Sequence, residues 1–96
     1  MNTYDMVMNG NSDNNIRFTD FRNLILSYGF AERIKGDHYV YKRNDIVERI
    51  VIQPLGNKAK AYQVKQAQIV INLWIESALE DGEEIPKPHL FSSEVV

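Results

Sequence analysis

The sequence predicts an α+β domain of the order α-β-β-β-α, in which two helices cover one face of a three-stranded antiparallel sheet. Two segments with apolar residues at three- and four-residue steps predict the helices. Three short runs between them, rich in β-branched and aromatic residues, predict strands, and the short loops joining these runs predict an antiparallel meander. The 96 residues are enough for one such domain with a single core.

The first helix follows a polar segment, residues 1–15, in which we expect a single helical turn at residues 4–8. Thr19 or Asp20 can cap the helix, which we expect to run to about Tyr28 and to end at Gly29. Its predicted apolar face consists of Phe18, Phe21, Leu24, Ile25 and Tyr28.

The strands are expected at residues 30–35, 38–43 and 48–53, with a turn at residues 44–45. Alternation assigns their side chains to two faces. The core face is predicted to carry Tyr39, Tyr41, Ile50 and Ile52. The opposite, basic face is predicted to carry Arg33, Lys35, His38, Val40, Lys42, Arg49, Val51 and Gln53. Glu32 has the parity of the core face, which an edge position of the first strand would allow.

The segment at residues 54–57 contains a proline and a glycine and is expected to break the third strand, leaving Lys58 and Lys60 in a loop. The second helix is expected at residues 63–81, where Gly82 ends it, and two further prolines keep the remaining chain extended. Its predicted buried stripe is Val64, Ala67, Val70, Ile71, Trp74, Ala78 and Leu79.

Charge is distributed unevenly along the chain. The net charge of −2 combines about +4 over residues 30–66 with about −5 over residues 67–96. A basic middle suggests a polyanionic partner, and an acidic end suggests a solvated tail or a segment that answers the basic surface. Solubility alone would explain either segment equally well.

Composition excludes several classes of site. Without cysteine there is no disulfide framework and no thiolate zinc site, and a reducing cytoplasm is expected. His38 and His89 are far apart in sequence, so we expect no metal and no cofactor, and His89 is expected to be a solvated bystander. The N-terminus lacks the pattern of a signal peptide, and the longest apolar stretch is too short for a membrane span.

The triplet Gly36-Asp37-His38 is the strongest functional signal from the residues themselves. An imidazole titrates near neutral pH and is the leading candidate for acid–base chemistry, while a glycine lets the chain turn and leaves room for a ligand. The surrounding Lys and Arg residues favour a phosphodiester substrate. From composition alone, a strand histidine that hydrogen-bonds a neighbouring backbone group is the alternative.

Five stretches, at residues 16–21, 28–30, 35–41, 52–54 and 58–66, together resemble the HicA family of bacterial toxin–antitoxin toxins. These toxins are small ribonucleases, or mRNA interferases, with a fold like that of double-stranded-RNA-binding domains. The resemblance covers roughly residues 10–73. It implies a HicA-like domain at residues 16–75, between a polar segment at 1–15 and an acidic helix end and tail at 76–96.

The resemblance implies that His38 is the catalytic residue of an RNA endonuclease that cleaves mRNA in the cytoplasm without metal. Gly36 and Asp37 would form the active-site loop, where Asp37 departs from the small hydroxyl residue of the family motif. A HicB-like antitoxin is the implied protein partner, and no membrane is implied. The expected RNA- and phosphate-binding residues are Arg33, Lys35, Lys42, Lys58 and Lys60.

Two alternatives to an active toxin stay open. Asp37 would repel a phosphate, which favours a non-catalytic RNA- or protein-binding module of the same fold. The acidic tail could instead fold over the basic face and inhibit the site in cis. For Tyr39, Tyr41 and Trp74, core packing is favoured over base stacking or partner binding.

Overall fold

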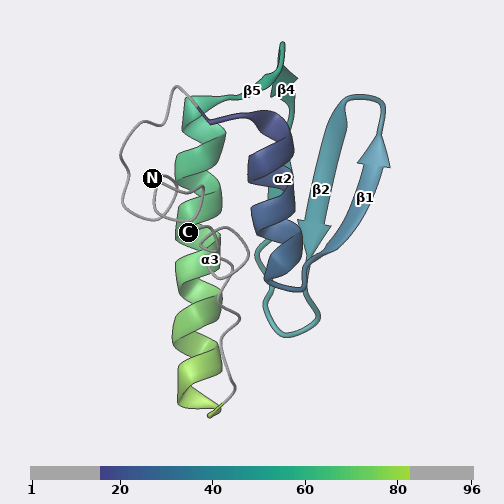
Figure 1. Cartoon of the computed structure of the whole chain (residues 1–96). Helices are drawn as coiled ribbons and strands as arrows, with labels where there is room; N and C mark the ends of the chain where they lie inside the picture. Colours follow the sequence, from purple (N-terminus) through teal and green to yellow (C-terminus); the bar gives the residue numbers. More distant parts are fainter. Residues whose placement is uncertain (1–15, 83–96) are drawn as a thin grey trace.

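The computed structural model describes residues 16–82 (Figure 1). The elements within these residues are helix α2 (Phe18–Ser27), strands β1 (Ala31–Lys35), β2 (His38–Lys42), β3 (Ile50–Ile52), β4 (Pro54–Leu55) and β5 (Lys58–Ala59), and helix α3 (Ala61–Glu80). The α+β class, with two helices and a three-stranded antiparallel sheet, is confirmed. The turn predicted at residues 4–8, His89 and the acidic tail lie outside the described residues.

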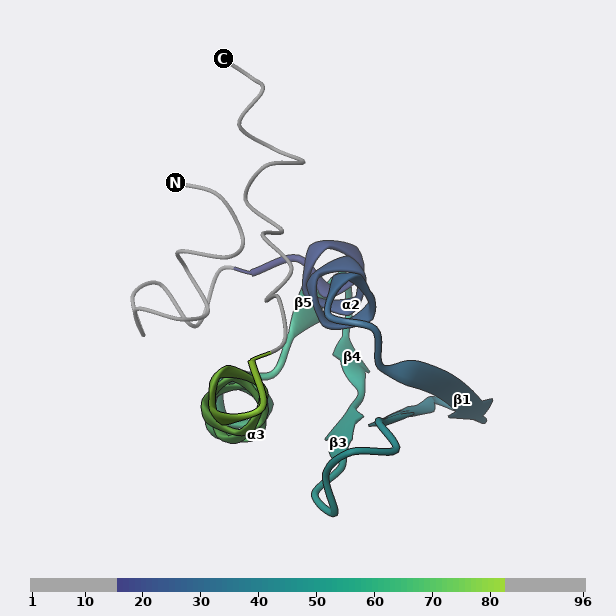
Figure 2. The ribbon, with the colours of Figure 1, turned by 90° about the horizontal axis from the view of Figure 1, so that it is seen from below.

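The main sheet has the strand order β1-β2-β3, so β2 is central and both its neighbours are antiparallel to it. The β1–β2 pairing places Lys35 opposite His38, and the β2–β3 pairing places Tyr39 opposite Ile52. Both helices lie on the same side of this sheet (Figure 2). Four residues of the predicted basic face, Arg33, Lys35, His38 and Lys42, lie in β1 and β2 and are exposed, whereas Arg49 and Gln53 lie outside β3.

The predicted core face of the sheet is confirmed. Tyr41, Ile50 and Ile52 are buried, and Tyr39 is half-buried. The Tyr39 ring packs edge-on against Phe18 of α2, with ring centroids 4.9 Å apart. These contacts tie the central strand to the first helix, so the orientation of β2, and with it the direction of the opposite face, is fixed by burial.

Helix α2 begins one residue before the predicted caps, and the expectation that Thr19 or Asp20 caps it is wrong. Arg17 holds the N-cap position without a side-chain capping bond. A distant backbone group takes over, because the Phe18 N–H donates to the Asn57 carbonyl at 2.9 Å. A tertiary hydrogen bond therefore satisfies a helix-end donor that sequence reasoning assigned to a local side chain.

The prediction of a loop at residues 54–60 is wrong in detail, because this segment forms the β4–β5 hairpin. Gly56 has a φ of +63° in its tight turn. The third strand of the main sheet is also shorter than predicted, beginning at Ile50 instead of Glu48, and the second ends at Lys42 instead of Arg43. The side chain of Arg43, which has the same parity as Tyr39 and Tyr41, points toward the helices and donates to the Tyr28 carbonyl.

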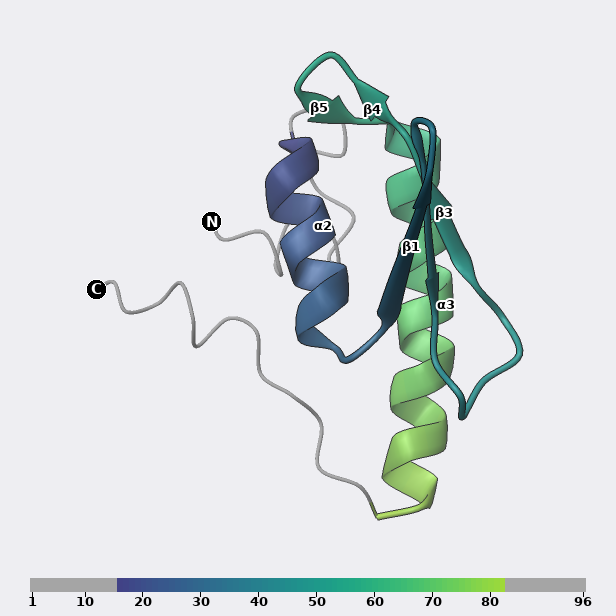
Figure 3. The same ribbon diagram turned by 90° about the vertical axis from the view of Figure 1, so that its right-hand side faces the viewer.

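Helix α3 spans twenty residues and begins two residues before its predicted start. The predicted stripe is buried with one exception, since Leu79 is 62% exposed. Figures 1 and 3 show that the last turns of α3 extend beyond the sheet; in the same turn as Leu79, Ala78 is buried, so the two residues lie on different faces of the helix. Among the described residues no helix has both the length and the apolar character needed to cross a membrane.

Candidate functional site

The turn between β1 and β2 presents His38 at one end of the sheet. His38 is the first residue of β2, and 56% of its side chain is exposed. Gly36 in this turn has a φ of +61°, a conformation that favours glycine. A Cβ at this position would meet nothing within 4 Å, so Gly36 is required by the backbone and the space beside it is open.

Asp37 faces the imidazole. Its Oδ1 lies 3.2 Å from Nδ1 of His38, close enough for an ion pair when the ring is protonated. A carboxylate at this distance favours a proton on Nδ1, because the two ring nitrogens are distinguished by what each one faces. Nε2 makes no hydrogen bond to another residue in the described range 16–82, so it is the nitrogen presented to a ligand.

The contact continues away from His38 through two more side chains. Gln53 donates a long hydrogen bond of 3.5 Å from Nε2 to Oδ2 of Asp37, and Lys60 donates from Nζ to Gln53 Oε1 at 3.2 Å. We call His38, Asp37, Gln53 and Lys60 the histidine chain. It joins the β1–β2 turn, the end of β3 and the start of α3.

The predicted cations divide between the two ends of the basic face. Lys35 lies opposite His38, and Arg33 is on the same face, opposite Val40. Lys60 reaches this end through Gln53. The exposed Lys58 lies on the β4–β5 hairpin, at the same end of the molecule as the β1–β2 turn (Figures 1 and 3).

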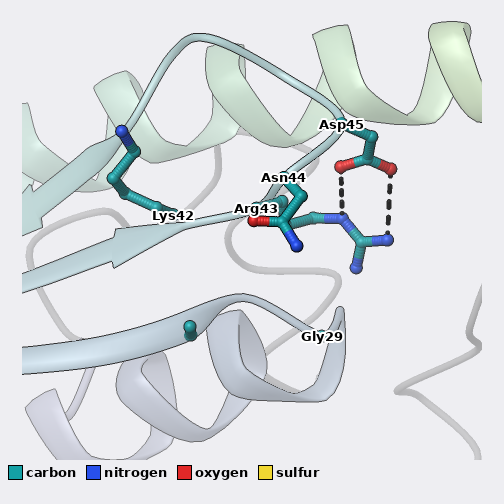
Figure 4. Close-up of a pocket in the computed structure, with 6 residues that line it drawn as sticks. Gly29, Lys42, Arg43, Asn44 and Asp45 are labelled. Carbon is teal, nitrogen blue, oxygen red and sulfur yellow. Dashed lines mark hydrogen bonds and ion pairs between the residues drawn. The ribbon is translucent and has the colours of Figure 1, made fainter.

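Lys42 is the member of the predicted set that the structure separates from His38. The two residues share a face of β2 but lie four positions apart, about 13 Å along a strand. Lys42 lines a shallow pocket of about 320 Å³ with Gly29, Arg43 and Asp45, and its ammonium points away from the Arg43–Asp45 pair (Figure 4).

The guanidinium of Arg43 is fully engaged by the protein itself at this second end. It donates to Asp45 at 2.9 and 3.2 Å, donates to the Tyr28 carbonyl and lies 4.3 Å from the centre of the Trp74 ring. Trp74 donates from Nε1 to Asp45 at 2.9 Å. The hydrogen bond from Arg43 is the main cause that lowers the pKa of Asp45. We call Tyr28, Arg43, Asp45 and Trp74 the arginine cluster.

A third polar group accounts for Glu32, the residue that did not fit the core face. Arg22 of α2 donates to its two carboxylate oxygens at 2.6 and 2.8 Å, and the Tyr41 hydroxyl donates at 2.7 Å. The bond from Arg22 is the main cause that lowers the pKa of Glu32, and burial is the main cause that raises the pKa of Tyr41. Glu32 is thus a brace between α2 and the edge strand β1.

The aromatic residues considered for base stacking or partner binding pack in the core. Tyr41 and Trp74 are buried, and Tyr39 packs against α2, so the preference for core packing is confirmed. Within residues 16–82, no group of three or more His, Cys, Asp or Glu side chains could hold a metal ion.

Two residues of the site were not singled out from the sequence. Gln53 was placed on the basic face by its parity, but nothing in the sequence shows that its amide joins Asp37 to Lys60. Gln63 is the buried polar residue of α3, and its Oε1 accepts the Gln53 backbone N–H at 2.8 Å. A glutamine among the apolar positions of a helix was the signal available for Gln63.

Comparison of the chain with protein-family models, with curated proteins and with solved structures gives no match. A function for this protein is therefore inferred from the geometry around His38 and from the resemblance described above.

Proposed function

We propose that the protein is an endoribonuclease that cleaves mRNA, with His38 as the general acid or base, and that it is the toxin of a toxin–antitoxin pair. The observation that carries the proposal is the exposed imidazole of His38, whose Nδ1 faces Asp37 while Lys35 lies directly across the strand pair. In the same proposal, the fold is of the double-stranded-RNA-binding type and a HicB-like protein is the partner.

The chemistry suits RNA because the 2′-hydroxyl is an internal nucleophile. It attacks the adjacent phosphorus, the bond to the 5′-oxygen breaks, and the products carry a 2′,3′-cyclic phosphate and a 5′-hydroxyl. His38 Nε2 would accept the 2′-hydroxyl proton or protonate the leaving oxygen, a contribution typically worth about 10²–10⁴-fold. Lys35 and Lys60 would supply positive charge for the phosphorane-like transition state.

Asp37 has two opposing effects in this proposal. Its carboxylate orients the imidazole, as a carboxylate does in many acid–base sites. It also adds negative charge next to the phosphate. Gln53 donates a hydrogen bond to the other oxygen of this carboxylate and is itself hydrogen-bonded to Lys60.

The test is RNA cleavage by the purified full chain in the presence of a chelator. Wild type is expected to give products with 2′,3′-cyclic phosphate ends, and His38→Ala is expected to give none. His89→Ala is the matched control and should cleave like wild type. RNA left intact by wild type, or cleaved equally by His38→Ala, would overturn the proposal.

One observation favours a second candidate, a module that binds RNA without cleaving it. The described site offers one imidazole, and the group nearest to it is a carboxylate, which opposes the approach of a phosphate. This candidate predicts salt-dependent RNA binding with no product in the cleavage assay. Inhibition in cis by the acidic tail stays a prediction, because that segment lies outside the described residues.

A further inference from the structure

Gln53 lies between β3 and β4, and its backbone is hydrogen-bonded to a side chain of α3. Its N–H donates to Oε1 of Gln63 at 2.8 Å, and Gln63 is 5% exposed, in the first turn of α3. A buried side-chain amide that accepts from a backbone donor resists displacement, since breaking the bond would leave both groups unsatisfied. The position of Gln53 is therefore fixed by the core and does not depend on the solvent-exposed turn.

The side chain of Gln53 stands between two opposite charges. It donates from Nε2 to Asp37 and accepts at Oε1 from Lys60. Among side chains, a primary amide is suited to this place because it donates and accepts at once and carries no charge. A carboxylate here would repel Asp37, and an ammonium would repel Lys60.

The uncharged side chain of Gln53 lies between the two charged groups, Asp37 and Lys60. If the amide were removed, Asp37 would lose the donor at its Oδ2 and Lys60 would lose its acceptor, and the opposite charges of these two side chains would attract each other. With Gln53 in place, Asp37 keeps its Oδ1 at Nδ1 of His38, and Lys60 keeps its charge at the same end of the sheet.

We propose that Gln53 is a positioning residue that holds Asp37 against Nδ1 of His38 and keeps Lys60 from neutralising Asp37. The consequence for RNA cleavage rests on the proposed function. The consequence for the imidazole does not, since the tautomer of His38 is a property of the folded chain alone.

The experiment is nitrogen NMR of the histidine rings in the full chain, at a pH above the imidazole titration. In wild type, the neutral His38 ring is expected to carry its proton mainly on Nδ1. Gln53→Ala, which keeps the backbone N–H that Gln63 accepts, is expected to lose this preference in favour of Nε2–H. Gln53→Glu should lose it too, because a carboxylate cannot donate the hydrogen bond that Gln53 gives to Asp37.

Two internal references accompany this measurement. The His89 ring should give the same signals in every variant, and Gln66→Ala, an exposed glutamine on α3, should leave the His38 tautomer as in wild type. An unchanged His38 tautomer in Gln53→Ala, or a wild-type ring without the Nδ1–H preference, would overturn the positioning role.

RNA cleavage separates this proposal from the previous one. If wild type cleaves RNA, Gln53→Ala should lower the rate by up to about 10²-fold, the scale expected when a reacting group is misplaced. If wild type leaves RNA intact while the tautomer still shifts in Gln53→Ala, the positioning role stands and the ribonuclease proposal fails.

Discussion

The two ends of strand β2 hold their charged side chains in opposite ways. At one end, the arginine cluster closes on itself, and Trp74 within it is 1% exposed. At the other end, the histidine chain opens to solvent, with His38 and Asp37 side chains 56% and 65% exposed. A network whose polar atoms all bind one another stabilises the fold, whereas a network exposed to solvent leaves polar atoms available to a ligand. For this reason we take the β1–β2 turn as the candidate site.

Perturbed pKa values support the same division, although they do not point to the site. The pKa values of Glu32 and Asp45 are lowered by hydrogen bonds from Arg22 and Arg43 respectively. Such shifts often mark functional residues, but structural ion-pair networks produce them as well. Here each shifted carboxylate faces a helix and joins it to a strand or loop, so the shifts identify braces of the fold.

The largest expected contrast is between Trp74→Ala and His38→Ala. Removing the buried indole should lower the free energy of unfolding by about 3–5 kcal/mol, because it empties core volume and takes away the donor to Asp45. His38→Ala removes an exposed side chain and should change it by less than about 0.5 kcal/mol. Urea denaturation of both variants measures the contrast, and comparable losses would show that the two ends are equally structural.

Two glycines allow the next test, because both have positive φ and only one is crowded. A Cβ at Gly29, with φ of +87°, would overlap the Arg43 guanidinium, whereas a Cβ at Gly36, with φ of +61°, meets open space. Gly36→Ala should cost about 1–2 kcal/mol from backbone strain alone. Gly29→Ala should cost more, since Arg43 is held by Asp45 and cannot move without losing that pair. Equal losses in thermal unfolding would indicate that Arg43 moves aside at no cost.

Glu32→Gln should change how stability depends on pH. The folded-state pKa of Glu32 lies below its ordinary value of 4.5, so its contribution to stability is present above about pH 4.5 and is lost as pH falls through the folded value. The variant should be less stable than wild type at pH 7 by about 1 kcal/mol, a modest figure because Arg22 is partly exposed. Denaturation at pH 7 and pH 3 should show the gap closing in acid, and a gap that widens would contradict the assigned direction.

The sequence predicts the fold well where burial decides the outcome. Alternation placed Tyr41 and Ile52 on the core face correctly, because one face of this sheet is covered by helices and a one-residue slip would expose both. It was wrong where a tertiary contact replaces a local one, as when the Asn57 carbonyl takes the place of a Thr19 or Asp20 cap.

The candidate site is harder to predict for the same reason. His38 and its neighbour Asp37 are adjacent in the chain, so sequence reasoning could find them together. Gln53 and Lys60 come to them only through the pairing of β2 with β3 and the hairpin that follows. Alternation correctly predicted the face of the sheet on which Lys42 lies. It did not show that Lys42 and His38 are far apart along the strand, because residues on one face can lie at opposite ends of it.

The smallest expected effect concerns the salt dependence of RNA binding and tests which end of the basic face the RNA contacts. If the RNA backbone lies across the β1–β2 turn, Lys35→Ala removes one phosphate contact. The plot of log K for RNA binding against log salt concentration should then become less steep by roughly 0.7–0.9. Lys42→Ala removes an equal charge from the same face about 13 Å away and should leave the slope nearly unchanged. The two variants have the same net charge, so any difference between them reports position and not total charge. Equal reductions would mean that RNA covers the whole face, and a reduction confined to Lys42→Ala would move the binding site to the arginine-cluster end.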